Sequence, residues 1–193
     1  MSRFTLTSKK FEDFGYVLDY LSHGKAGFMK GQFRAEPIIQ LIGEIHFTLL
    51  EATPRGGTSV TLGDRVYIGK DFSRDKIGHI LGRINYNDLT SAAKAELPLI
   101  LEEAIRSNES RFTSFFNEAQ AVTPRMHSLE LLPGIGKKHS WAILDLRDRE
   151  PFQNFQDLAE RSQLSDPVKI LARRIIEELS ETEPKYRLFT RQT

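Results

Sequence analysis

The stretch that decides the fold of the C-terminal part is Ser128-Leu-Glu-Leu-Leu-Pro-Gly-Ile-Gly-Lys-Lys-His-Ser140. Pro133 presets a backbone angle for a tight turn. Gly134 and Gly136 permit conformations that other residues avoid and leave room for a ligand. We expect Ile135, between them, to anchor the turn in the core. The pattern therefore predicts a tight turn between two short helices, with the second helix beginning near Gly136.

A helix that begins there places unpaired backbone amides and its positive dipole end at the turn. Bare glycine backbone lets a phosphate reach these amides, and the lysines that follow add positive charge. Such a site contacts phosphate and not base edges, so we expect binding with little sequence preference. A ligand-free turn between helices is the alternative. The predicted binding residues here are Pro133, Gly134, Ile135, Gly136, Lys137, Lys138 and His139.

Residues 129–147 resemble the helix-hairpin-helix motif of DNA repair and recombination proteins. In that family the hairpin amides hold a backbone phosphate, in some members together with a monovalent cation bound by hairpin carbonyls. The resemblance implies a nucleic-acid ligand and allows such a cation; we expect no other cofactor. Ser140 stands where alanine is usual, and it is small enough to fit.

A second, degenerate copy is predicted to follow. Its turn would be Gln163-Leu-Ser-Asp166, which lacks the glycine pair, and Asp166-Pro167 is a typical helix start. We expect this copy to be mainly structural. Lys169, Arg173 and Arg174 could contact the second strand of a nucleic acid, although a solvated helix face is the alternative. The tail is expected to dock through Tyr186, Leu188 and Phe189.

The N-terminal part is predicted to be β-structure, with strands expected at 17–21, 38–51, 60–62, 66–68 and 77–86. Within the long second strand, Gly43 would form a bulge or bend. Short strands separated by glycine turns favour a small antiparallel barrel of the OB type, because closure removes exposed edges. The predicted α+β fold comprises an OB-like barrel (1–88), a helical connector (89–122), a tandem helix-hairpin-helix domain (123–180) and a tail (181–193).

Within the connector, Thr90 is the expected N-cap of a helix. Pro98 is expected either to kink that helix or to start a new one.

One stretch of the predicted barrel is locally basic. Residues 65–83 contain five Lys or Arg and two Asp, a local charge of +3, with Tyr67 and Phe72 among them. Aromatic stacking combined with phosphate neutralisation is how OB-folds hold single strands. We therefore expect contacts from Arg65, Lys70 and Arg83; core aromatics beside a solvated charged loop are the alternative.

Composition excludes some classes of site. The chain has no cysteine, so disulfides and thiolate zinc sites are absent, and a cytoplasmic location without membrane association is expected. The net charge is only +1, so nucleic-acid binding must come from local patches.

Five scattered histidines show no metal-ligand spacing. Asp145, Asp148 and Glu150 could form the Mg²⁺ site of a nuclease, but acids at a helix end are commoner, so no catalytic activity is expected.

A protein-interaction adaptor is the remaining alternative. Tandem helix-hairpin-helix domains can also bind proteins, and the near-neutral charge is compatible with this role. Trp141 would lie on an exposed contact face in that case, or fill an interface within the chain.

The chain as a whole resembles an archaeal family, domain-of-unknown-function family 655. The likeness is carried by Phe14-Gly-Tyr-Val-Leu-Asp-Tyr-Leu21, Glu36-Pro-Ile-Ile-Gln-Leu-Ile-Gly-Glu44, Arg65-Val-Tyr-Ile-Gly-Lys70 and the run 126–138. It implies a barrel followed by helix-hairpin-helix units and an RNA- or nucleotide-binding role. RNA is therefore the expected ligand in preference to DNA, with a protein partner as a further expectation.

Overall fold

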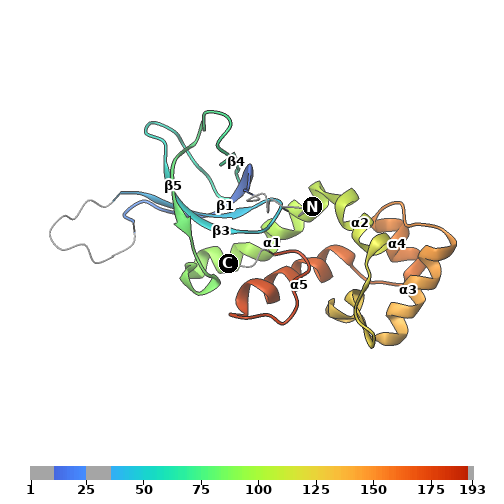
Figure 1. Ribbon diagram of the computed structural model, residues 1–193. Coiled ribbons are helices and arrows are strands. Elements are labelled where there is room, and N and C mark those ends of the chain that lie inside the picture. The colour runs from blue at the N-terminus through green and yellow to red at the C-terminus, as the bar shows by residue number, and fades with distance from the viewer. Residues whose placement is uncertain (1–10, 25–35, 191–193) are drawn as a thin grey trace, which may run out of the picture. The chain divides into compact units, whose positions relative to one another are not determined.

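The computed structural model describes residues 11–24 and 36–190, and it has an α+β fold (Figure 1). The chain forms two compact units, Met1–Ile84 and Asn85–Thr193. The helices expected as a separate connector lie in the second unit, together with the predicted hairpins.

The first unit contains one curled antiparallel sheet, a half-barrel, with the strand order β4-β1-β2-β3-β5 (Figure 1). Its core is built from aliphatic side chains on the inner face, among them Val17, Leu41 and Ile77. The edge strands are β4 and β5. The strands are β1 (Phe14–Leu21), β2 (Ile38–Gly43), β3 (Leu49–Pro54), β4 (Arg65–Tyr67) and β5 (Ile77–Arg83).

The prediction of one continuous strand over 38–51 was wrong, because β2 and β3 are separate antiparallel strands. A buried carboxylate organises the turn between them: Glu12 accepts hydrogen bonds from three backbone N–H groups of residues 45–48, at 2.9 to 3.2 Å. Phe47 adopts φ 52° in this turn while its ring is buried. Gly43 makes space for Glu12, since a Cβ there would collide with the carboxylate.

The prediction of a strand at 60–62 was also wrong. This segment is a loop in which Asp64 accepts hydrogen bonds from the backbone N–H and hydroxyl of Thr61, at 3.0 and 2.9 Å. The hydrogen bond from Lys76, followed by that from the Thr61 amide, lowers the pKa of Asp64. The last strand ends at Arg83, before the short 3₁₀ helix η1 (Tyr86–Asp88).

The second unit is mainly helical. Thr90 caps α1 as predicted, accepting the N–H of Ala93 at 3.0 Å. Pro98 lies inside α1, so the alternative in which it starts a new helix was wrong; the break falls at Asn108. The elements are α1 (Ser91–Ser107), α2 (Glu109–Glu118), β6 (Ala121–Thr123), β7 (Met126–His127), η2 (Ser128–Leu131), α3 (Lys137–Arg149), α4 (Phe155–Ser162) and α5 (Pro167–Ser180).

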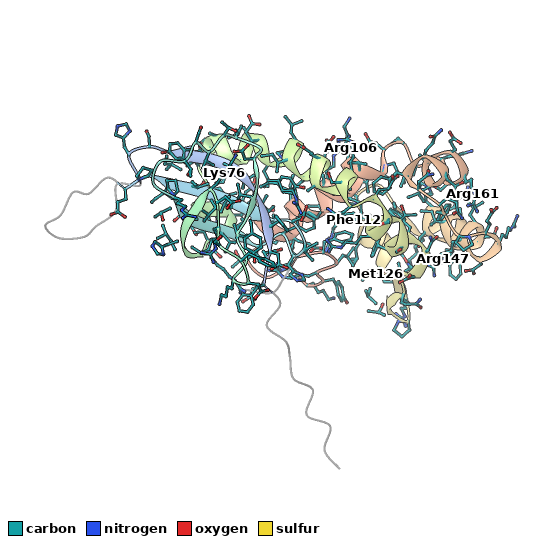
Figure 2. All side chains as sticks on the ribbon, turned by 90° about the horizontal axis from the view of Figure 1, so that it is seen from above. Lys76, Arg106, Phe112, Met126, Arg147 and Arg161 are labelled. Carbon is teal, nitrogen blue, oxygen red and sulfur yellow. The ribbon has the colours of Figure 1, made fainter. Side chains whose placement is uncertain are left out.

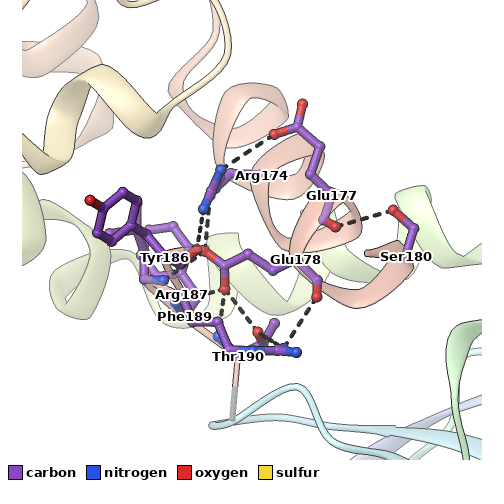
Figure 3. A network of polar contacts seen from close by, with 9 residues as sticks. Arg174, Glu177, Glu178, Ser180, Tyr186, Arg187, Phe189 and Thr190 are labelled. Carbon is purple, nitrogen blue, oxygen red and sulfur yellow. Dashed lines mark hydrogen bonds and ion pairs between the residues drawn. The ribbon is translucent and has the colours of Figure 1, made fainter. Parts of the chain in front are cut away.

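The predicted docking of the tail is confirmed. Glu178 of α5 is buried, and its carboxylate accepts the backbone N–H groups of Leu188, Phe189 and Thr190 at 2.7, 3.2 and 2.9 Å (Figure 3). Arg174 donates to the same carboxylate at 2.9 Å. The Phe189 ring packs against aromatic rings of α2, with centroid distances of 4.9 and 5.6 Å.

Candidate nucleic-acid interface

The turn at residues 132–136 is anchored from inside. Ile135 and Leu132 are 3% and 2% exposed, which confirms that Ile135 holds the turn in the core. The N–H of Ile135 donates to the carbonyl oxygen of Leu132 at 3.0 Å. Gly134 has φ 84°, a left-handed conformation that favours glycine. The short element before the turn is the 3₁₀ helix η2.

Helix α3 begins immediately after the turn, with Gly136 as its N-cap. The hydrogen bond from the N–H of Ser140 to the carbonyl of Gly136, at 2.9 Å, begins the helical ladder. The N–H groups of Lys137, Lys138 and His139 therefore precede the ladder, and in the described structure no N-cap side chain reaches them. Gly136 and both lysines are exposed. The turn thus presents free amides and two positive charges to solvent.

The two glycines of the turn differ in what requires them. Gly134 needs its left-handed backbone, whereas Gly136 has φ −88°, which any residue adopts. A Cβ added at Gly136 would meet nothing within 4 Å. The fold of this unit therefore gives no reason for glycine at position 136. A ligand that approaches the backbone closely would give one.

His139 has a structural role. Its Nε2 lies 2.8 Å from the carbonyl oxygen of Ser162 and, because a carbonyl can only accept, donates a hydrogen bond that joins α3 to the end of α4. Ser140 is 1% exposed, and its Oγ has no hydrogen-bond partner among the described residues. Of the predicted residues after the glycine, only the two lysines have exposed side chains.

A histidine also starts the first element of this motif. His127 caps η2: its Nδ1 accepts the N–H of Leu129 at 3.2 Å, and its own N–H donates to Glu130 at 2.8 Å. Burial, assisted by the positive charge of Arg147, lowers the pKa of His127. The cap is formed by the neutral imidazole, because a protonated Nδ1 could not accept the hydrogen bond.

The second turn, at residues 163–166, is closed by its own side chains. Gln163 takes the left-handed position with φ 59°, and Leu164 is the buried anchor. Asp166 is the N-cap of α5, as predicted, and accepts the N–H of Lys169 at 3.1 Å. The ammonium of Lys169 lies 3.4 Å from the same carboxylate, while Arg173 is exposed. A carboxylate thus stands where the first turn has only glycine backbone.

Two arginines of this unit, labelled in Figure 2, are used internally. Arg147 of α3 donates to the carbonyls of Phe116 and Ala119, each at 2.9 Å. Arg161 of α4 donates to the carbonyls of Leu146 and Glu150 at 3.0 and 2.7 Å. These guanidinium groups hold helix ends together. The exposed positive charge at the first turn therefore comes from Lys137 and Lys138.

In the half-barrel, the three predicted cations have different surroundings. Arg65 forms two hydrogen bonds of 2.8 Å with Glu44 and lies 3.7 Å from the ring centroid of Phe14. The hydrogen bonds that Arg65 donates to Glu44 raise the pKa of Arg65. Lys70 and Arg83, which like Arg65 are exposed, form no ion pair with a carboxylate among the described residues, and they line one cavity together. The structure thus brings two of the three together and pairs the third with a carboxylate.

Each unit also has an exposed aromatic side chain. Trp141 on α3 is 71% exposed, so it does not fill the core of its unit. Phe11, which sequence reasoning missed, is 51% exposed, and the Nζ of Lys70 lies 4.2 Å from its ring centroid. The sequence gives only a weak signal for Phe11, because this residue precedes the first strand and is not part of an alternating or helical pattern of apolar residues.

The acidic residues considered for a metal are dispersed into other contacts. Asp145 pairs with Arg149 at 2.7 Å, and Asp148 lies 3.8 Å from Arg147. Over residues 11–24 and 36–190, no three His, Asp or Glu side chains gather as metal ligands. In the same part of the chain, no helix is both long and apolar enough to cross a membrane.

Comparison with known proteins agrees with this architecture over nearly the whole chain. A family model described as a protein of unknown function, DUF655, matches residues 11–191. The uncharacterized protein MJ0038 of Methanocaldococcus jannaschii is 44% identical over 184 residues, which cover 95% of this chain and 82% of that protein. The crystal structure of Af1531 from Archaeoglobus fulgidus, from the same family, superposes with a TM-score of 0.85 at 45% identity. The match covers 93% of this chain and 100% of that one. The chain therefore belongs to the DUF655 family of proteins of unknown function.

Proposed function

We propose that this protein binds the phosphate backbone of nucleic acid, RNA in preference to DNA, through the turn at residues 132–136 and the first turn of α3. The protein acts as a non-catalytic binder with little sequence preference, because backbone amides and lysines recognise phosphate and not base edges. In this proposal, residues 128–149 and 155–180 are two helix-hairpin-helix units, and the half-barrel is an OB-like domain.

The observation that carries the proposal is the uncapped N-terminus of α3 beside open space at Gly136. Three other α-helices of the unit are closed by their own side chains: Thr90 caps α1, Asn154 caps α4 and Asp166 caps α5. The remaining helix, α2, has Glu109 in its first turn, which repels an anion. Helix α3 instead combines free amides with two lysines, which favours a phosphate.

The turn at residues 132–136 alone contributes only modestly to the affinity for nucleic acid. Two lysines and a few amides neutralise one or two phosphates, whereas the chain as a whole carries a net charge of only +1. Affinity at physiological salt therefore needs a second contact on the same ligand. RNA is preferred on the family resemblance. A monovalent cation held by carbonyls of the turn is compatible with this mode of binding.

The test is a salt titration of binding to a fluorescently labelled single-stranded oligoribonucleotide, read by anisotropy. The logarithm of the binding constant should fall linearly with the logarithm of the salt concentration. The double variant Lys137→Ala, Lys138→Ala should make that slope shallower by about 1.4, or 0.7 per phosphate contact. The matched double variant Lys169→Ala, Arg173→Ala removes the same charge at the closed turn and should change the slope less. Absence of binding to every RNA and DNA form at low salt would refute the proposal.

A protein-interaction adaptor is the second candidate, and the exposure of Trp141 favours it. An indole that is 71% exposed is the kind of side chain that forms the centre of a protein interface. In this case Trp141→Ser would abolish the binding of a protein partner, and the Lys137, Lys138 double variant would leave that binding intact. The nucleic-acid proposal predicts instead that the Lys137, Lys138 double variant weakens RNA binding and that Trp141→Ser leaves RNA binding intact.

A further inference from the structure

The half-barrel contains a cavity of about 310 Å³. Its lining includes the aliphatic side chains of Leu50 and Ile68, which belong to the core cluster, and Ile80, which packs against it. Three basic side chains, of Lys70, Arg74 and Arg83, also line the cavity, beside Phe11, Glu12, Thr48 and two glycines. The cavity thus combines an apolar floor, formed by the aliphatic side chains, with a rim that carries three cations.

The sheet register explains why charge and apolar surface meet there. Arg83 pairs with Leu50 across β5 and β3, so the two side chains share the inner face of the sheet. A register shift next to this pair brings Ile80 opposite Ala52, also on the inner face. Arg83 consequently stands at the edge of the apolar floor.

Two of the three rim cations are available to a ligand. Lys70 and Arg83 are exposed, and neither forms an ion pair with a carboxylate in the described part of the chain. Arg74 has a bracing role, since its Nε donates to the carbonyl of Gly69 at 3.0 Å. Glu12 also lines the cavity, but its carboxylate is already bound by three backbone N–H groups. The rim therefore favours an anion.

A second hollow, of about 490 Å³, adjoins the first, since both are lined by Gly69, Lys70 and Arg74. It adds Arg55 and the ring of Phe72, which is 75% exposed. Phe72 is held in place: its N–H donates to the Tyr67 hydroxyl at 3.1 Å, and its ring lies 5.8 Å from the Tyr67 ring. An exposed aromatic ring on a supported loop offers a surface on which a base can stack.

We propose that the 310 Å³ cavity receives the base of one nucleotide of a single strand, with the adjoining phosphate held by Lys70 and Arg83. The next nucleotide then lies along the hollow at Phe72. A volume at the lower end of the range for ligand pockets suits one nucleotide and excludes a base pair. The inference rests on the proposed function in taking nucleic acid as the ligand, but it concerns different residues and names the single strand as the substrate class.

The experiment measures binding of the full-length protein to four ligands: a single-stranded oligoribonucleotide, an abasic strand of equal length, a duplex and a free nucleoside monophosphate. Affinity is read by competition against the labelled single strand, and the methyl resonances of Ile68 and Ile80 report occupation of the cavity. The single strand should bind most tightly and shift both methyl groups. The abasic strand should shift neither. Equal affinity for the abasic strand, or for the free nucleotide, would overturn the assignment.

Variants separate this inference from the proposed function. Lys70→Ala, Arg83→Ala should weaken binding of the single strand roughly tenfold or more, because it removes two charged contacts. Arg125→Ala, at an exposed position of the other unit, is the charge control and should have little effect. If only Lys137→Ala, Lys138→Ala weakens binding, the cavity proposal fails and the hairpin proposal stands. If only the Lys70, Arg83 variant weakens binding, the hairpin proposal fails and the cavity proposal stands.

Discussion

The Nε2 of His139 donates a hydrogen bond to the carbonyl oxygen of Ser162, at 2.8 Å. This contact links the first turn of α3 to the last residue of α4, and so connects the two turns of the unit. Because Ser162 is only 5% exposed, its carbonyl has little access to water when the histidine is removed. The orientation of the open helix end thus depends on a neighbouring helix as well as on its own sequence.

His139→Ala should lower the free energy of unfolding by about 1–3 kcal/mol, the cost of leaving a buried acceptor unpaired. Lys138→Ala, at the exposed neighbouring position, should stay within about 0.5 kcal/mol of the wild type. Urea denaturation followed by circular dichroism measures both. Equal stability of His139→Ala and the wild type would show that the contact does not support the fold.

Glu178→Gln should release the tail and destabilise the helical unit. The carboxylate accepts from three backbone amides and from Arg174, and an amide group can satisfy these donors only in part. Breaking one side of a buried ion pair costs about 3–5 kcal/mol. Limited proteolysis at Lys185 and Arg187 should become faster, because the tail is held by this residue.

Glu177→Gln is the matched control for that experiment. Its carboxylate is half exposed and lies 3.7 Å from Arg174, so its loss should cost less than about 1 kcal/mol. If both variants had the same stability and the same proteolysis rate, the Glu178 network would not be what holds the tail.

Stability should fall with decreasing pH through protonation of His127. Burial and the Arg147 charge lower its pKa in the folded state. The unfolded chain therefore takes up the proton first, below the ordinary value of about 6.5. The stabilisation is complete above that pH and is lost as the pH falls through the lower folded pKa. Protonation also removes the acceptor for the N–H of Leu129, which costs about 1 kcal/mol.

His127→Asn tests this pH dependence. Asparagine is a good N-cap that does not titrate, so the variant should keep the cap and lose part of the decline below about pH 6.5. Urea midpoints measured across this range for both proteins give the comparison. If the urea midpoints of both proteins declined in parallel with falling pH, protonation of His127 would not be the cause of the decline.

Local rules were enough to predict the turn at 132–136 and the ends of several helices. Pro133, Gly134 and Ile135 define the turn within a few residues, and Thr90 and Asp166 cap their helices by contacts to residues three positions away. The same rules identified the two exposed lysines. They did not show that the imidazole of His139 is used by Ser162, a residue that is distant in sequence.

Errors arose where a long-range contact overrides a local pattern. The alternation of residues 45–49 favours a strand, but Glu12 binds the backbone amides of that segment and turns the chain. Arg65 has the same composition signal as Lys70 and Arg83, yet Glu44 neutralises it. Neither acid is near its partner in the sequence, so periodicity and local charge could not identify the pairing.

Phosphate binding at the first turn of α3 is tested most directly by the affinity of Gly136→Ser for the single-stranded oligoribonucleotide. A serine at the N-cap has open space and an ordinary φ, and its hydroxyl occupies an amide of the first turn, so stability should be equal or a few tenths of a kcal/mol higher. We expect the affinity to fall about tenfold, because the phosphate loses an amide and its close approach. The emission of Trp141, the single tryptophan and one helical turn beyond Lys137, reports binding at this site. If a stable Gly136→Ser protein binds as tightly as the wild type, the first turn of α3 does not hold the phosphate.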